Sequence, residues 1–136
     1  MRISRDEDVP NTVDFQNETE VLAWAAGAHE KRPWRLQFID QLVREVAGYR
    51  DGPMTVLELG SGPGFLAERM LRCCPSIVRY TALDYSETML GLSRDRLSDF
   101  HARVRFVQAN FSEAQWAAHA GGPFDSVVTM RRLCMK

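Results

Sequence analysis

The residues best suited to chemistry form a glycine-rich run with an acid just before it. Gly60, Gly62 and Gly64 stand at alternate positions, and Glu58 lies two residues before the first of them. Glycine tolerates the positive φ angles of a tight loop and lets a ligand lie against bare backbone. An apolar run precedes the loop and an amphipathic segment, 65–71, follows it. This order predicts a strand, a loop and a helix that together form a nucleotide-like cofactor site.

A second acid strengthens this interpretation. Asp84 ends the next apolar run, 20 residues after Gly64. In a doubly wound sheet, an acid at this point reaches the hydroxyls of a bound ribose. Its two oxygens can accept from both the 2′ and the 3′ hydroxyl, whereas a phosphate there would be repelled. The alternative is that Asp84 is a solvated turn residue, or an Asx cap before the following helix.

The charge of Glu58 discriminates between cofactors. A dinucleotide fingerprint has the spacing G-x-G-x-x-G and places a pyrophosphate at the helix N-terminus. This chain has G-x-G-x-G, with Phe65 where the third glycine is expected. Glu58 would repel a pyrophosphate but could hold a cation, and S-adenosylmethionine carries both an ammonium and a sulfonium. Charge therefore favours S-adenosylmethionine over NAD, and an NAD-binding oxidoreductase fragment stays as an alternative.

Alternating elements position these residues. Apolar runs predict strands, and apolar residues at helical spacing between breakers predict helices. We expect strands at 54–59, 78–83, 104–107 and 124–130, and helices at 19–29, 33–46, 63–73, 86–97 and 112–119. Strand–helix alternation of this kind implies right-handed crossovers and a parallel sheet. The predicted fold class is therefore α/β and Rossmann-like.

Composition excludes several function classes. The 136 residues carry a net charge of −1, which gives no electrostatic argument for nucleic acid or for an anionic membrane. No apolar stretch is long enough to span a bilayer, and the N-terminus does not resemble a signal peptide. The three cysteines are too few for a disulfide framework and have no metal-ligand spacing. We therefore expect a cytoplasmic protein with reduced thiols and no metal site.

Four segments in order resemble the class I S-adenosylmethionine-dependent methyltransferases of the small-molecule type. They are Val56–Gly64, Thr81–Ser86 with Met89 close behind, Val104–Phe111 and Phe124–Met130. The resemblance spans roughly residues 34–130 and implies a sheet whose retained strands are ordered 3-2-1-4. It also implies S-adenosylmethionine as cofactor and methyl transfer to an unknown, small-molecule acceptor.

The resemblance assigns roles around the methionine part of that cofactor. It places Glu58 beneath the methionine moiety, which the backbone from Gly60 through Ser61 and Gly62 to Gly64 wraps. Thr129 would lie near the methyl-bearing sulfur. Arg35 is a candidate partner for the cofactor carboxylate.

Further roles concern the adenosine part. The resemblance gives the ribose hydroxyls to Asp84 and places Tyr85 and Met89 on either side of the adenine. Asn110 stands where the family usually has an acid that receives the adenine amino group, and Phe111 would pack beside the ring. No catalytic residue is named, because methyl transfer mainly requires alignment of the acceptor and exclusion of water.

The sequence also suggests a division of the chain. We expect a flexible tail at 1–18, the cofactor-binding methyltransferase domain at 19–130, and a divergent or truncated end at 131–136. The family's sheet has seven strands, so strand 124–130 would be an apolar edge open to self-association. A non-catalytic truncated form that acts as a binding or interaction module is therefore a second alternative, and catalysis by this chain alone is left open.

Overall fold

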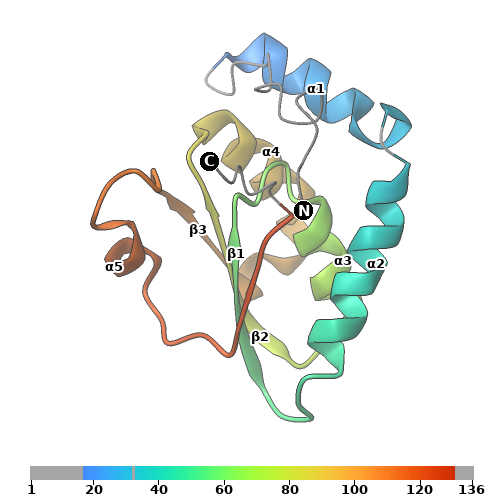
Figure 1. Cartoon of the computed structure of the whole chain (residues 1–136), viewed down its shortest axis with the longest axis vertical. Coiled ribbons are helices and arrows are strands. Elements are labelled where there is room, and N and C mark those ends of the chain that lie inside the picture. Colours follow the sequence, from blue (N-terminus) through green and yellow to red (C-terminus); the bar gives the residue numbers. More distant parts are fainter. Residues whose placement is uncertain (1–16, 32, 131–136) are drawn as a thin grey trace, which may run out of the picture.

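The computed structural model describes residues 17–31 and 33–130 (Figure 1). The predicted divergent end at 131–136, and the predicted tail up to residue 16, lie outside the described residues. The elements in chain order are α1 (Glu18–Lys31), α2 (Trp34–Ala47), β1 (Met54–Leu59), α3 (Phe65–Cys73), β2 (Ile77–Asp84), α4 (Glu87–Arg96), the 3-10 helix η1 (Ser98–Arg103), β3 (Val104–Gln108), α5 (Trp116–Ala120) and β4 (Ser126–Val128).

The strands form one parallel sheet in the order β3-β2-β1-β4. Leu57 of β1 pairs with Thr81 of β2 on one side and with Val127 of β4 on the other. This confirms the predicted α/β fold and the 3-2-1-4 strand order. β1 is therefore a central strand, which explains its nearly continuous apolar sequence.

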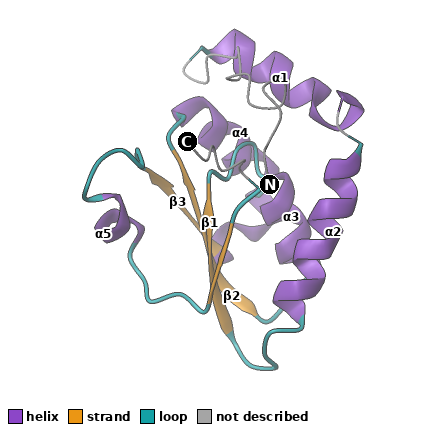
Figure 2. Cartoon of the chain, in the orientation of Figure 1, coloured by secondary structure: helices purple, strands orange, loops and turns teal. Residues whose placement is uncertain are grey.

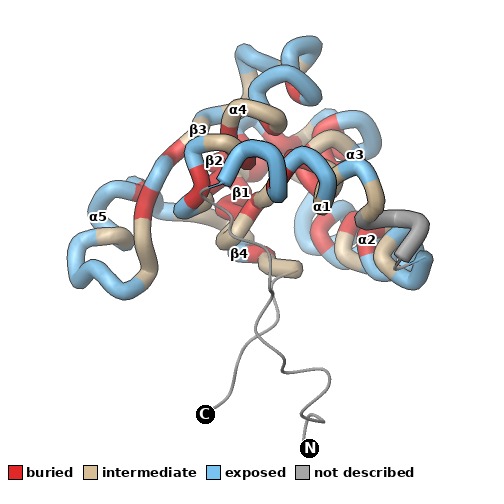
Figure 3. The backbone as a smooth tube through the Cα atoms, turned by 90° about the horizontal axis from the view of Figure 1, so that it is seen from above, coloured by how far each residue is buried: buried red, intermediate tan, exposed pale blue. Residues whose placement is uncertain are grey.

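The two faces of the sheet are covered unequally (Figure 2). The larger core joins one face to the inner sides of α2 and α3, with Val56, Leu66 and Tyr80 among its members. The smaller core lies on the other face, where Leu57 and Leu83 meet the segment that carries α5. Figure 3 shows that buried positions concentrate around the strands, whereas α5 is mostly exposed. The loop ends of the strands are thus held by one well-packed helical layer.

Several element boundaries differ from the predicted ones, and in three cases a side-chain hydrogen bond lies at the difference. The predicted helix 112–119 begins only at Trp116, because Oδ1 of Asn110 accepts from the N–H of Ser112 and draws residues 110–113 into a turn. The predicted strand 124–130 is paired only at 126–128, and the hydroxyl of Thr129 donates to the carbonyl of Leu59 beyond it. Glu18, assigned to the tail, instead begins α1, where Asn17 accepts from the N–H of Glu20.

Arg103 closes the turn between α3 and β2. Its guanidinium donates to the carbonyls of Leu71, Cys74 and Ile77 at 2.9, 2.8 and 2.9 Å. The carbonyls of Leu71 and Cys74 lie at the end of α3, where intrahelical donors run out, and Ile77 is the first residue of β2. A single side chain therefore fixes the connection between two elements of the larger core.

We predict that Arg103→Ala lowers the free energy of unfolding by about 2 kcal/mol, because it removes charge-assisted hydrogen bonds to partly buried carbonyls. Urea unfolding followed by circular dichroism measures the change. Arg79→Ala, at an exposed position of β2, is the matched control and should change the free energy by less than about 0.5 kcal/mol. Equal losses for the two variants would contradict this role of Arg103.

Candidate functional site

The two acids singled out in the sequence lie at the carboxyl ends of neighbouring parallel strands. Glu58 is the penultimate residue of β1, and it pairs in register with Ala82. Asp84 is the last residue of β2, two positions after Ala82. The carboxyl edge of an open α/β sheet is where ligands bind in such folds. The predicted juxtaposition of Glu58 and Asp84 is therefore present.

The glycine loop connects β1 to α3 in a conformation that requires glycine. Gly60, Gly62 and Gly64 have φ angles of 70°, 60° and 95°. A Cβ on Gly64 would lie 2.8 Å from Oγ of Ser93, so α4 packs directly against the loop backbone. A Cβ on Gly62 would meet no atom of the described residues within 4 Å. Gly64 thus serves close packing, whereas Gly62 leaves bare backbone beside open space.

Asp84 holds this loop from below. Its Oδ2 accepts from the N–H of Gly62 at 2.7 Å, and its Oδ1 accepts from the N–H of Ser86 at 2.8 Å. Ser86 in turn caps α4 by accepting from the N–H of Met89. The Asx-type turn that the sequence left open is therefore real. A carboxylate offers about four acceptor sites, so it retains capacity for further donors such as ribose hydroxyls.

Glu58 is buried, with an exposed fraction of 1%. Burial is the main cause that raises the pKa of Glu58 to about 8, and the nearby Asp84 raises it further. The hydrogen bond from Tyr80 and the positive charge of Arg35 act in the opposite direction. Near neutral pH the carboxyl of Glu58 is therefore largely protonated, and an added positive charge would favour its ionisation.

Sequence reasoning missed Tyr80 as the partner of Glu58. Its hydroxyl donates to Oε1 of Glu58 at 2.6 Å. The available signal was a hydroxyl-bearing residue in an apolar strand, at the even spacing that places Tyr80 and Ala82 on one face. The acid that lies opposite Tyr80 is set by the register between the strands, and the sequence does not determine that register.

Arg35 on α2 carries a positive charge that lowers the pKa of Glu58. Its guanidinium carbon lies 5.6 Å from the centre of the Trp24 ring. Trp24 belongs to α1, so the cation–π contact joins the two N-terminal helices. This position is compatible with the expected role of Arg35 toward a cofactor carboxylate.

The remaining predicted site residues differ in their availability. Tyr85 is 44% exposed, as a side chain that flanks a ligand would be, whereas Met89 is buried in α4. The hydroxyl of Thr129 donates to the carbonyl of Leu59, which fixes Thr129 beside the end of β1. Phe111 stacks edge-to-face with Trp116, with 5.2 Å between the ring centres.

Asn110 is arranged differently from the expectation. Its Oδ1 accepts from both the N–H and the hydroxyl of Ser112, at 2.9 and 2.8 Å. Both lone pairs of the amide oxygen are thus in use. The predicted acceptance of an adenine amino group by Asn110 would require the hydroxyl of Ser112 to give way.

The residues present fit an adenosyl sulfonium cofactor. Within the described part of the chain, the hydroxyl of Ser61 in the glycine loop is buried without a hydrogen-bond partner, so it could form a hydrogen bond with a ligand. The open space beside Gly62 and the acids on both sides of the loop complete a cradle for a cationic group. Within residues 17–31 and 33–130, no cluster of histidine, cysteine and acidic residues could hold a metal ion.

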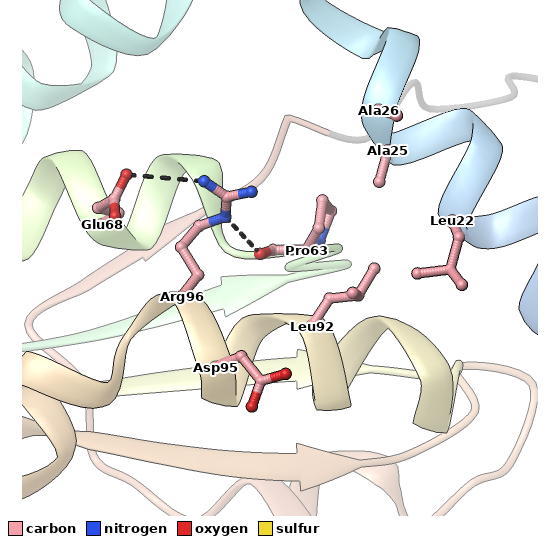
Figure 4. Close-up of a pocket in the computed structure, with 8 residues that line it drawn as sticks. All are labelled: Leu22, Ala25, Ala26, Pro63, Glu68, Leu92, Asp95 and Arg96. Carbon is pink, nitrogen blue, oxygen red and sulfur yellow. Dashed lines mark hydrogen bonds and ion pairs between the residues drawn. The ribbon is translucent and has the colours of Figure 1, made fainter.

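A separate hollow of about 510 Å³ lies between α1 and the outer side of the loop (Figure 4). Leu22 and Leu92 point toward one another across it, and Arg96 donates to the carbonyl of Pro63. None of the predicted cofactor residues lines this hollow. It is therefore distinct from the cradle at the strand ends.

Comparison with known proteins decides the family. A family model described as "Methyltransferase domain" matches residues 56–135, more than half of the chain. The chain belongs to this methyltransferase family. The class I methyltransferases of this family use S-adenosylmethionine as the methyl donor. The charges of Glu58 and Asp84 favour the same cofactor.

Curated relatives extend this similarity. The chain is 38% identical over 82 residues to the release factor glutamine methyltransferase of Chlorobaculum tepidum, an alignment that covers 58% of this chain and 27% of that protein. It is 32% identical over 111 residues to the protein-lysine N-methyltransferase efm4 of Schizosaccharomyces pombe, covering 76% and 45% respectively. The chain thus spans less than half the length of these methyltransferase relatives.

Solved structures agree on the fold. The methyltransferase domain of bacterial CtHen1 superposes with a TM-score of 0.53 at 20% sequence identity, over 67% of this chain and 47% of that one. At this level of identity the similarity shows the fold of the methyltransferase domain and not its acceptor.

We predict that Glu58 makes the stability of the unliganded protein depend on pH. Because folding raises its pKa from 4.5 to about 8, its contribution is fully present below pH 4.5 and is lost as pH rises through 8. Glu58→Gln, which resembles the protonated acid, should become more stable than the unchanged protein as pH rises from 5 to 8. The difference should grow by up to about 1.4 kcal/mol per pH unit. Urea unfolding at several pH values measures it, and a difference independent of pH would contradict the burial of a protonated Glu58.

Proposed function

We propose that this chain supplies the S-adenosylmethionine-binding half of a methyltransferase, with the cofactor lying across the carboxyl ends of β1 and β2. The observation that carries the proposal is the glycine loop, held open at Gly62 by Asp84 and flanked by Glu58. Bare backbone between two acids suits a ligand with positive charge on its methionine end and hydroxyls on its ribose. The same charges disfavour the pyrophosphate of NAD.

Roles follow from the positions of the side chains. Asp84 accepts from the ribose hydroxyls with the acceptor sites that the loop leaves unused. The backbone of Gly60, Gly62 and Gly64 and the hydroxyl of Ser61 line the methionine part, with Glu58 beneath it. Arg35 is the proposed partner of the cofactor carboxylate.

A second group of side chains completes the proposed site. Tyr85 and Met89 border the adenine, the exposed Tyr85 by direct contact and the buried Met89 by supporting the start of α4. Phe111 and Asn110 bound it from the loop after β3. Thr129, whose hydroxyl donates to the carbonyl of Leu59, would lie near the methyl-bearing sulfur.

The chemistry needs little from the protein beyond geometry. The bound sulfonium supplies a methyl carbon that is already activated for in-line displacement. The residues named above orient it and exclude water, which is the main source of rate in such a reaction. No general base is assigned in this chain.

For the acceptor we propose a small molecule. The net charge of −1 provides no attraction for a polyanion. Relatives act, by their names, on a release factor, on protein lysine and on ribosomal RNA, so acceptor classes vary widely around one cofactor fold. No helix in the described part of the chain is long and apolar enough to cross a membrane. We further propose that the protein works in a reducing compartment, where an exposed thiol such as Cys73 stays free.

Calorimetric titration with S-adenosylhomocysteine tests the cofactor site. We expect micromolar binding by the unchanged chain and at least a tenfold loss in Asp84→Ala, because two backbone N–H groups and the ribose lose their acceptor. Gly62→Ala should weaken binding similarly, since its new methyl group would occupy the space beside the loop.

Gly91→Ala is the control for the glycine substitution. Gly91 lies within α4, and a Cβ there meets no atom of residues 17–31 or 33–130 within 4 Å, so this change should leave affinity unaltered. NAD is titrated in parallel. Tight NAD binding without S-adenosylhomocysteine binding would overturn the proposal in favour of an oxidoreductase fragment, and binding of neither would favour an interaction module.

Self-association is a second proposal, carried by β4. Within the described residues this strand pairs only with β1, and its Val127 is 57% exposed on the thinly covered face. An apolar strand edge attracts another strand. We expect sedimentation velocity to show concentration-dependent association, which Val127→Lys reduces. A single monomeric species at all concentrations would count against it.

A further inference from the structure

A phenol and a carboxyl form a buried pair in the larger core beneath the cofactor cradle. Tyr80 has an exposed fraction of 0% and Glu58 of 1%, and their oxygens are 2.6 Å apart. In the register of the sheet, Tyr80 faces Val56 while Glu58 faces Ala82. The hydroxyl therefore reaches diagonally from β2 to the neighbouring strand. This separation lies within the range of O–H···O hydrogen bonds.

Packing alone does not account for the hydroxyl. The ring of Tyr80 packs among Val56, Met70 and other apolar members of the larger core, where a phenylalanine ring would fill nearly the same space. Burying a hydroxyl among apolar side chains costs free energy unless it is hydrogen-bonded. The partner that the structure gives this hydroxyl is Glu58. The oxygen of Tyr80 therefore acts on Glu58.

The direction of the hydrogen bond is fixed. Burial, together with the adjacent carboxyl of Glu58, raises the pKa of Tyr80 well above its usual value. The phenol consequently remains protonated, and its hydroxyl donates to Oε1. Oε2 is left as the oxygen that carries the proton of Glu58 or, once that proton has gone, accepts from a second donor.

Charged groups reach Glu58 from two elements. Asp84, at the end of the strand that carries Tyr80, opposes a second negative charge, and Arg35, on α2, favours it. Because Asp84 and Arg35 shift the pKa of Glu58 in opposite directions, the binding of another charged group nearby can change its protonation state. A cation bound on the glycine loop is such a charge.

We propose that Tyr80 is a positioning residue for the cofactor: it holds Oε1 of Glu58 so that Oε2 receives the positive charge of the ligand's methionine end, and ligand binding releases the proton of Glu58. This inference rests on the proposed cofactor site. The proton passes from Oε2 to the solvent buffer as the ligand ammonium replaces it, and no other bond is made or broken. Cofactor affinity is thereby coupled to pH through Glu58, and Tyr80, which the ligand does not touch, sets the pH at which this coupling acts.

Calorimetry with S-adenosylhomocysteine tests this coupling. Titrations at pH 7 in phosphate and in Tris, which differ in ionisation enthalpy, yield the number of protons released. We expect most of one proton per ligand for the unchanged chain and almost none from this source for Glu58→Gln. Because the ligand's own amino group titrates equally in all variants, the difference between variants reports Glu58.

Tyr80→Phe should then weaken binding about tenfold at pH 7, since the ionised carboxyl loses a charge-assisted hydrogen bond. The pH at which affinity rises should move upward, which a purely structural role would not produce. In a Glu58→Gln background the same change should have little effect, because Tyr80 acts through Glu58. Tyr49→Phe, at an exposed position, is the matched control and should leave both affinity and its pH dependence unchanged.

Distinct outcomes separate the two proposals. If the unchanged chain binds S-adenosylhomocysteine but Tyr80→Phe has the same affinity and pH profile, the role of Tyr80 is overturned and the cofactor site stands. If the unchanged chain does not bind the ligand, both fall. Should Tyr80→Phe fail to fold, carbon-13 NMR of the Glu58 carboxyl in the unchanged chain decides: a carboxyl that stays protonated after ligand is added overturns the inference.

Discussion

The carboxylate of Asp84 is the constraint on which the site depends. It stands at the last residue of β2 and binds the N–H of Gly62 in the loop of the neighbouring strand and the N–H of Ser86 at the start of α4. The carbonyl of Leu83, just before it, accepts from the N–H groups of Gly60 and Ser61. One strand end thus fixes the loop of another, so the open space beside Gly62 is held in place before any ligand arrives.

Much of this arrangement could be predicted from the sequence, because its signals are local. The apolar run 54–59, the alternate glycines and the acid at Asp84 determine a strand, a loop and a second strand end with little help from distant residues. Parallel pairing then brings Glu58 and Asp84 to one edge whatever the details of packing. Ser86, a favourable N-cap residue, likewise predicted the start of α4.

The predictions from sequence are wrong where side chains compete with the backbone for hydrogen bonds. Oδ1 of Asn110 captures the N–H of Ser112, which delays α5 and occupies the oxygen expected to meet an adenine. The pair of Tyr80 and Glu58 could not be predicted from the sequence for another reason. It depends on the register of two strands and on the depth at which Glu58 is buried, and neither is encoded in a short segment. Whether a buried acid near a glycine loop is ionised or protonated depends on the residues packed around it, and these are known only from the folded structure.

A crystal structure of the chain with S-adenosylhomocysteine tests the central claim most directly, because it locates the ligand relative to the strand ends. The account predicts ribose hydroxyls within hydrogen-bond distance of Asp84 and the amino end of the ligand on the glycine loop above Glu58. A ligand bound elsewhere, for example in the hollow between Leu22 and Arg96, with Asp84 untouched, would contradict it.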